Sequence, residues 1–506
     1  MILPRALVAA AALAAAGFAL ADPVSLKREI PAAAEPSLGI AIVVRDQAPL
    51  RSAPRDSARS HALLWQGEAL EVRGERMDYL QVYDHRRERG GFVRASQVRR
   101  TMLAPNEARE LLAVVRFLRD TPGAEALGIG FAAAYIGAAA PEIFNGDAGV
   151  EALDALGTFA DRLARRASSG AAQSKAAQAA LSAHLDVAVR YGVGFTSHER
   201  GGRVQICYDG DAFRRVLAMR SSPEQRARAA LALTRAECIA PSLPPTERNR
   251  MDEWRAEVLE RVDARPLPPY LRNRVLMRRA GVWAGLAYQI ERKGETSDAA
   301  EERALSALAG VDKTELTDED AAAYHEAAMR VAASRWAYSP APAGTGRQPH
   351  IVTAPGRPGE TCIALLDARN DAAHALAKRC TYGIVWTNST TLNREGTALA
   401  VAVQPTESWR ELWLFRKAGN GWTIRVLPPA PADPDVGYAE FAGWVPGGAK
   451  MLVAREARAE GRYLRRFEIV RLATLTAERQ AGAPGALREF QRWQDPAWRR
   501  ETVSLR

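Results

Sequence analysis

The sequence contains none of the short motifs that mark the common catalytic folds. A GxSxG elbow, an HExxH pair, a GxxxxGKS/T loop and a GxGxxG turn after a strand-like segment are all missing. The seven histidines are scattered, and no two of them lie at the spacing of a metal-binding pair. We therefore predict no metal, no cofactor and no catalytic residue, and favour a non-catalytic protein.

Lysine is scarce as well, since only seven of the 69 basic residues are lysines. The formal net charge is +10, and arginine supplies most of the positive charge. The positive excess lies toward the two ends. Residues 38–100 hold 12 basic against 8 acidic residues, and residues 445–506 hold 13 against 7. Such surfaces can meet anionic cell-wall polymer or lipid headgroups. No nucleic-acid-binding motif accompanies them, so we expect no nucleic-acid partner.

Long apolar runs are missing beyond the N-terminus. The best candidate, residues 124–140, includes Glu125 and several glycines and is more typical of a buried helix. The N-terminus itself is typical of a secretory signal peptide over residues 1–21, with one early charge, Arg5, and an apolar run of 15 residues at 6–20. Ala19 and Ala21 supply the small residues that a signal peptidase needs. We expect cleavage after Ala21, a short linker over 22–37, no remaining transmembrane segment, and a periplasmic location.

Export makes disulfides permissible for the four cysteines. Between Cys207 and Cys238, a helix start at residues 209–211 and a second start at 221–224 predict a helical hairpin. The start of its first helix would lie beside the end of its second, which brings Cys207 to Cys238. Such a bridge stabilises a fold by about 3–4 kcal/mol in the chain-entropy model.

Cys362 and Cys380 flank two short β-like runs and would face each other in a β-hairpin. The alternatives are a metal site and a redox pair. The spacing is not CxxC-like and no histidine stands at ligand spacing, so two structural disulfides are favoured.

Residues 38–101 are predicted to form a small β domain of short strands separated by turns. Its segments, in order, are Pro49-Leu50-Arg51-Ser52-Ala53-Pro54, Gln66-Gly67-Glu68, Asp78-Tyr79-Leu80-Gln81-Val82 and Gly91-Phe92-Val93. This order resembles the bacterial SH3-like domain family, with Tyr79 and Phe92 where that family usually has tryptophan. The resemblance implies a small β-barrel that binds cell-wall peptides or other proteins.

A peptide groove would use exposed aromatic side chains, and the candidates in this domain are Trp65, Tyr79, Tyr83 and Phe92. Alternate members of the set could instead fill the barrel core. We expect Tyr79 and Phe92 to lie partly in that core, and Trp65 and Tyr83 to be more exposed.

Residues 105–338 carry helical periodicity in successive segments and predict a central all-α domain. A polar cluster stands beside Cys207 and contains His198, Glu199, Arg203 and Asp209. It could form an acid/base site, but a solvated loop with a helix cap is favoured.

Residues 339–349 form a Pro/Gly linker, and residues 350–490 turn to strand-like runs before a tail at 491–506. Two segments in this region share a turn-and-strand layout, with Gly396 and Gly448 52 residues apart. They are similar to the repeats of TolB-like (WD40-like) propellers. Because the region has room for about three blades, we expect a partial propeller or a β-sandwich.

The sequence thus predicts a multidomain α+β protein that resembles exported bacterial SH3 domain-containing proteins. The favoured function is binding or scaffolding in the cell envelope, with peptidoglycan or an envelope protein as partner. The alternative is a cell-wall enzyme with its site near His198 and Asp209.

Overall fold

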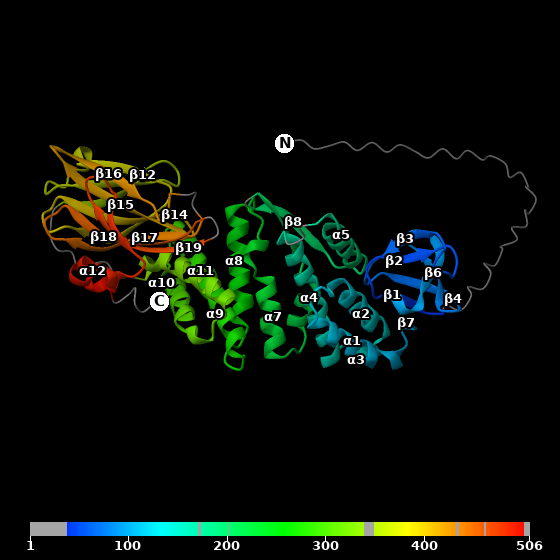
Figure 1. Ribbon diagram of the computed structural model, residues 1–506. Coiled ribbons are helices and arrows are strands. Elements are labelled where there is room, and N and C mark those ends of the chain that lie inside the picture. Colours follow the sequence, from blue (N-terminus) through cyan, green and yellow to red (C-terminus); the bar gives the residue numbers. More distant parts are fainter. Residues whose placement is uncertain are drawn as a thin grey trace, which may run out of the picture.

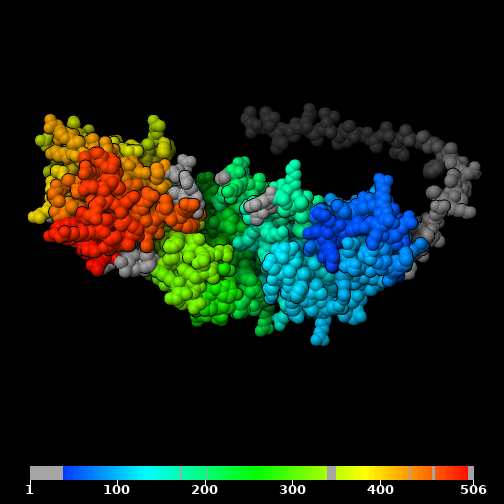
Figure 2. Space-filling model, in the orientation of Figure 1, coloured from blue at the N-terminus to red at the C-terminus, as the bar shows by residue number. Residues whose placement is uncertain are grey.

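The computed structural model describes residues 38–170, 174–200, 202–338, 349–431, 435–459 and 462–499. An N-terminal antiparallel sheet, a central helical unit and a C-terminal set of sheets follow one another along the chain, which confirms the mixed α and β class. Figure 1 shows them along one arched body with the two sheet units at its ends, and Figure 2 shows this body as one continuous surface. The predicted signal peptide, the 22–37 linker and most of the 339–349 linker lie outside the described residues.

The N-terminal sheet consists of β1 (Ile40–Val43), β2 (Ala48–Arg51), β3 (Ser60–Leu64), β4 (Ala69–Arg76), β5 (Tyr79–Asp84), β6 (Arg89–Arg94) and β7 (Val98–Thr101). Their order is β3-β2-β6-β5-β4-β1-β7, with β3 and β7 at open edges. The expected closed barrel is therefore wrong for the described strands. On β5, Leu80 and Val82 point into the core while Gln81 points outward, as strand alternation requires.

The central unit contains α1 (Ala108–Arg119), α2 (Glu125–Ala138), α3 (Pro141–Phe144), α4 (Asp147–Ser168), α5 (Lys175–Arg190), β8 (Phe195–Arg200), β9 (Arg203–Tyr208), α6 (Asp211–Ala218), α7 (Pro223–Leu233), α8 (Pro245–Glu260), α9 (Pro269–Arg292), α10 (Asp298–Ala309) and α11 (Asp318–Ser334). Helix α7 begins behind Ser222, whose hydroxyl accepts from the Gln225 amide, and α11 begins behind Thr317 in the same way. The β8–β9 hairpin corrects the all-α prediction for this region.

The C-terminal unit contains β10 (His350–Pro355), β11 (Thr361–Leu366), β12 (Ala377–Thr381), β13 (Ile384–Leu392), β14 (Ala398–Thr406), β15 (Trp409–Ala418), β16 (Gly421–Leu427), β17 (Gly437–Val445), β18 (Lys450–Ala459), β19 (Arg462–Arg471), β20 (Ala477–Ala481) and α12 (Arg488–Trp493). Single 3-10 turns join several elements along the chain: η1 (Ala95–Gln97), η2 (Pro105–Glu107), η3 (Ala236–Cys238), η4 (Lys313–Glu315), η5 (Arg335–Ala337), η6 (Ala372–His374) and η7 (Pro484–Ala486).

These C-terminal strands pack as successive layers. Leu399 on β14 packs toward Ile363 in the β10–β12 sheet, whereas its neighbour Ala400 packs toward Met451 on β18. On the far side of β17–β19, Phe490 of α12 and Trp498 pack against Phe467, so the predicted C-terminal tail is partly built into the core. The β10–β12 sheet, the β13–β16 meander and the β17–β20 meander therefore pack face to face in chain order. The two meanders are also hydrogen-bonded into one eight-stranded sheet by a short parallel pairing of β15 with β17.

The two repeated glycine turns occupy equivalent positions in this stack. Gly396 lies between β13 and β14, Gly448 lies between β17 and β18, and each connection joins the first two strands of a four-stranded antiparallel meander. The two turns also meet, since the Gly447 amide donates to Glu395 at 3.1 Å. The repeat in the sequence is thus a repeat in the structure.

The N-terminal sheet shares its packing with the helices. Ile42 of β1 belongs to the core cluster of α1, α2 and α4, and the Tyr191 hydroxyl donates to the Gly67 carbonyl at 2.7 Å. Glu68 is buried beside Arg87 and Arg190. The sheet is fixed to the helices by apolar and charged contacts together.

A buried charged network holds the C-terminal sheets on the helices. Arg410 of β15 has no exposed surface, donates to the Ala332 carbonyl of α11 at 2.6 Å and faces Glu440. Arg335 pairs with the same Glu440. Helix α11 and strands β15 and β17 therefore form one joined wall.

Within the described ranges, no helix combines the length and hydropathy needed to cross a bilayer.

We predict that Gly67→Ala destabilises the protein more than Gly123→Ala does. Both glycines have φ near +84 and +83, so both variants incur backbone strain of about 1–3 kcal/mol. At Gly67 the new methyl group would also lie 2.3 Å from the Ala126 carbonyl, whereas nothing lies within 4 Å at Gly123. The apparent Tm should therefore fall further for Gly67→Ala, and equal losses would show that the close contact between sheet and helix is not formed.

We also predict that Glu301→Gln changes the pH dependence of stability. Burial raises the pKa of Glu301 to about 8 from 4.5, and the hydrogen bond from Ser334 offsets only part of that rise. The stabilisation from this proton is present in full below pH 4.5 and is lost as pH rises toward 8.

Chemical denaturation should give near-equal free energies of unfolding for the wild-type protein and Glu301→Gln at pH 4.5. At pH 8 the variant should be the more stable of the two by roughly 1–3 kcal/mol. Burial also raises the pKa of Glu456, to about 7, so Glu456 contributes to the same pH dependence. The comparison is therefore repeated with Glu456→Gln added to both the wild-type protein and the Glu301→Gln variant. An unchanged difference between pH 4.5 and pH 8 would contradict the prediction.

Candidate functional site

A cleft of about 730 Å³ lies between the helical unit and the C-terminal sheets. Its walls come from α4, α7, α8 and α11, from the η3 segment, and from the turn at residues 406–408 between β14 and β15. This volume is in the range of pockets that bind small ligands, roughly 300–1,000 Å³.

Helix α9 crosses the cleft with one face. Arg274, Arg278 and Gly281 follow at intervals of four and three residues, which places them in one row along the helix. Gly281 carries no side chain, and a Cβ there would have Arg330 as its nearest neighbour, at 3.6 Å. The row therefore directs two guanidinium groups toward the cleft, and Gly281 leaves room beside them.

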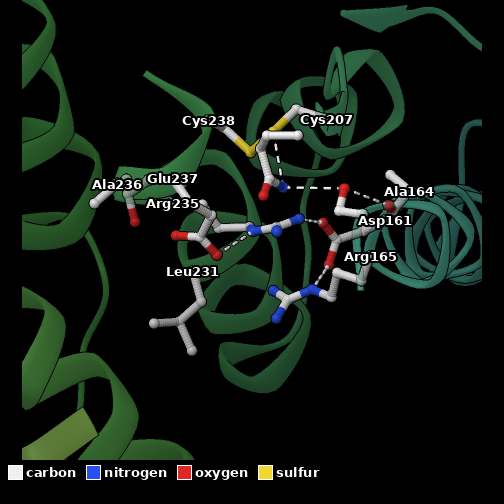
Figure 3. Close-up of polar contacts among 12 residues, drawn as sticks. Asp161, Ala164, Arg165, Cys207, Leu231, Arg235, Ala236, Glu237 and Cys238 are labelled. Atoms are coloured by element: carbon white, nitrogen blue, oxygen red, sulfur yellow. Dashed lines mark hydrogen bonds and ion pairs between the residues drawn. A yellow bond between two sulfur atoms is a disulfide. The ribbon is translucent and has the colours of Figure 1, made fainter. Parts of the chain in front are cut away.

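The cleft is unusually rich in charge, because nine arginines and eight carboxylates line it. Most of these groups are paired. Figure 3 shows one chain of pairs, in which Arg165 binds Asp161 at 2.7 Å, Asp161 binds the buried Arg235 at 2.6 Å, and Arg235 binds Glu237 at 2.8 Å. Burial raises the pKa of Glu237, but the charges of Arg278 and Arg235 outweigh it and lower that pKa to about 2.

Arg278 differs from the others in its partners. Its Nη1 donates to the carbonyls of Thr234, at 2.6 Å, and Leu231, at 3.4 Å, and it forms no ion pair with the described carboxylates. Burial lowers the pKa of Arg278 to about 10; Glu237 opposes this fall, and nearby arginine charges add to it. This half-buried cation therefore has two carbonyls and the charge of Glu237 as its compensation.

The hairpin β8–β9 closes one side of the cleft, and a disulfide fixes it. Cys207 on β9 is bonded to Cys238 in η3, which confirms the predicted pairing. The predicted helical hairpin between the two cysteines is present as α6 and α7, with Cys207 before the first helix and Cys238 after the second. Cys207 itself lies on a strand that the sequence did not indicate. Figure 3 shows this bridge directly above the Arg235–Glu237 pair.

The predicted polar cluster is spread over this hairpin. His198 lies 2.9 Å from the Glu237 carbonyl, while Glu199 is its neighbour on the strand and so points to the opposite face. Arg203 pairs with Arg200 in the hairpin register, and Asp209 accepts from the Asp211 amide at the start of α6. The structure thus gives His198 a carbonyl as its partner and places Asp209 in the turn before α6, whose N-cap residue is Gly210.

Of the four predicted aromatic residues, three share one face of the N-terminal sheet. Tyr79 and Tyr83 alternate on β5, and Phe92 lies opposite the exposed Gln81 between them. Tyr79 is buried, with its hydroxyl 2.6 Å from Asp56, whereas Tyr83 and Phe92 are half-buried.

The fourth aromatic residue lies elsewhere. Trp65 stands edge-on to His184 of α5, with ring centres 6.3 Å apart. This position places Trp65 at the junction with the helices, so the aromatic face consists of Tyr83 and Phe92 with Gln81, covered at one side by Arg73 over the Tyr83 ring at 3.9 Å.

The second predicted disulfide is also present, since Cys362 and Cys380 are bonded and stand opposite each other on β11 and β12. Glu360 joins them in the one grouping of possible metal ligands among the described residues. Both sulfur atoms of that grouping are already bonded to each other, so its donor set does not fit a metal. Two disulfides fit a protein that folds in an oxidising compartment.

Sequence reasoning missed the cleft. Its arginines are spread from residue 162 to residue 330, and only the folding of five helices brings them together. The spacing of Arg274 and Arg278 along one helix face was the available signal. No family model, curated protein or solved structure matches the chain.

We predict that replacing both Cys207 and Cys238 with Ala destabilises the protein by about 3–4 kcal/mol, given their separation of 31 residues. The hairpin should also loosen, so trypsin should cut faster after the exposed Arg200 and Arg203. The matched control replaces Cys362 and Cys380. Limited proteolysis with mass spectrometry should show accelerated hairpin cleavage for the first pair only, and equal rates for both would contradict this role of the disulfide.

Proposed function

We propose that the protein is an exported binding or scaffold protein of the bacterial cell envelope, located in the periplasm. Its N-terminal unit, which resembles bacterial SH3-like domains, would bind the peptide part of peptidoglycan. The observation that carries this proposal is the aromatic face formed by Tyr83, Phe92 and Gln81 on the N-terminal sheet.

Two features of that face suit a peptide ligand. Aromatic rings with a polar neighbour provide apolar contact area and a hydrogen-bonding group side by side, which peptide-binding domains commonly use. Arg73 and Arg94 lie over Tyr83 and Tyr79, and arginine can pair with the carboxylates of an acidic peptide. Residues 38–100 as a whole also carry a net positive charge, which favours an acidic ligand.

The attachment of the sheet to the helices leaves this face available. The contacts with the helical unit are made by β1 and by residues 65–68, and by ion pairs of Asp46 with His184, of Arg86 with Asp186 and of Arg99 with Glu110. Gln81 at the centre of the aromatic face is exposed. The remaining units would hold this module at one end of a long body and connect it with other envelope components.

Co-sedimentation with purified peptidoglycan tests the proposal. We predict that the purified protein pellets with peptidoglycan, and that the double variant Tyr83→Ala/Phe92→Ala binds at least about 10-fold more weakly, because losing two contact aromatics removes well over 1.4 kcal/mol. The control is Phe117→Ala, which removes an aromatic side chain that is 73% exposed on α1.

Equal binding by the wild-type protein and the double variant would place the peptidoglycan contact elsewhere. A chain that does not pellet at all would contradict peptidoglycan as ligand, and a specific envelope protein captured through Tyr83 and Phe92 would identify the partner as protein instead.

A further inference from the structure

Three arginines from distant parts of the sequence converge on the η3 segment at the end of the cleft. Arg200 of β8 donates to the Ala236 carbonyl at 3.3 Å, and Arg278 of α9 acts on the Glu237 carboxylate by charge. Arg165 of α4 joins through the Asp161–Arg235–Glu237 chain of ion pairs. All three line the cleft.

The charge at this end of the cleft is not balanced. Five arginines stand against three carboxylates, which leaves an excess of two positive charges. The arginines are Arg165, Arg200, Arg255 and Arg278 of the lining together with the buried Arg235 behind it, and the carboxylates are Asp161, Glu237 and Asp252. Asp252 is fully engaged, because Arg255 binds it at 2.6 Å and Gln289 at 2.9 Å.

The opposite wall of the cleft has the reverse balance. Glu326 and Asp435 both bind Arg458, and Glu407 lies 3.5 Å from Arg330. Glu326 and Glu407 pair with Arg330 of their own wall. Hydrogen bonds from Arg458 and, more weakly, the charges of Arg330 and Arg200 lower the pKa of Asp435, so Arg200 also acts on this carboxylate. The carboxylate that acts on Arg278 is Glu237. An incoming anion is therefore attracted to the wall that carries Arg165 and Arg278 and repelled from the opposite wall, which carries Glu326 and Glu407.

The guanidinium groups also have donors to spare. Arg165 uses its Nε for Asp161 and is half-exposed, and Arg200 uses only Nη1 in its described hydrogen bond. Arg278 uses Nη1 for two carbonyls. Planar guanidinium forks match the paired oxygens of carboxylates and phosphates, which makes arginine the usual residue at such sites.

We propose that this end of the cleft is a binding site for a small oxyanionic ligand, with a phosphate or carboxylate group held between Arg165, Arg200 and Arg278. The ligand enters from the cleft, and its anionic group displaces water from a site whose walls are already formed. The disulfide between Cys207 and Cys238 joins β9 to the η3 segment. It therefore fixes the position of β8, which pairs with β9 and carries Arg200, relative to η3. This site is separate from the aromatic face of the N-terminal sheet, so either proposal can fail without the other.

Calorimetric titration of the full chain with pyrophosphate and with glutarate tests this site and distinguishes a phosphate from a carboxylate ligand. Ionic strength is held constant with potassium chloride, because screening alone weakens charge interactions. We expect saturable binding of at least one probe with one site per chain. Replacing Arg200 or Arg278 with Gln should weaken binding about 10- to 100-fold, as expected for one lost hydrogen bond between charged groups.

Arg203→Gln is the matched control. Arg203 is the cross-strand partner of Arg200 on the same hairpin, carries the same charge and does not line the cleft. Its replacement should change the affinity less than 2-fold. Since Arg278 also holds two carbonyls of α7, the exposed Arg200 provides the test should Arg278→Gln fail to fold.

The proposal is overturned if neither probe binds at millimolar concentration, or if Arg200→Gln and Arg203→Gln weaken binding equally. Equal weakening would mean a diffuse attraction by the hairpin charge and no defined site.

Discussion

Arg410 lies without exposed surface between strand β15 and helix α11, where it donates to a backbone carbonyl and faces Glu440. Moving such a cation out of water costs several kcal/mol, and only well-placed partners offset that cost. Here the partners come from both units, since the carbonyl is on the helix and the carboxylate is on β17. The C-terminal sheets therefore have one favourable position on the helices. The turn at residues 406–408 is held in that position and forms part of the cleft wall.

The other junction follows a different principle. The N-terminal sheet gives Ile42 to the core of the helices and brings Gly67 against the backbone of α2, so close packing fixes its position. Charged groups such as Glu68 and Arg190 surround that contact. Because both junctions are packed and charge-paired, the body behaves as one arched unit whose aromatic face and arginine cleft lie in different parts.

Local signals predicted local structure well. Helices α6 and α7 begin at the two starts that the sequence indicated, and both cysteine pairings are confirmed. Strand β8 escaped prediction because it carries polar residues on both faces, which removes the alternation that identifies strands. Strand β9 does alternate, with Val204 and Ile206 following Arg203 and Gln205 in turn, but this signal is only a few residues long. The N-terminal sheet was expected to close into a barrel, but β3 and β7 remain at its edges. Whether a sheet closes depends on the register and twist of its strands, and short strands give little sequence signal for either. The cleft was invisible for the same reason, because its charges meet only through tertiary packing.

The layered C-terminal strands form a short stack in which each sheet covers the face of the one before it. A stack of this kind could in principle add further layers, as repeat proteins do, and its last face would remain adhesive until something polar covered it. Here α12 and Trp498 lie on that face and bury Phe467 and Ile469 beneath them. Helix α12 and Trp498 thus keep a broad apolar sheet face from pairing with a second molecule.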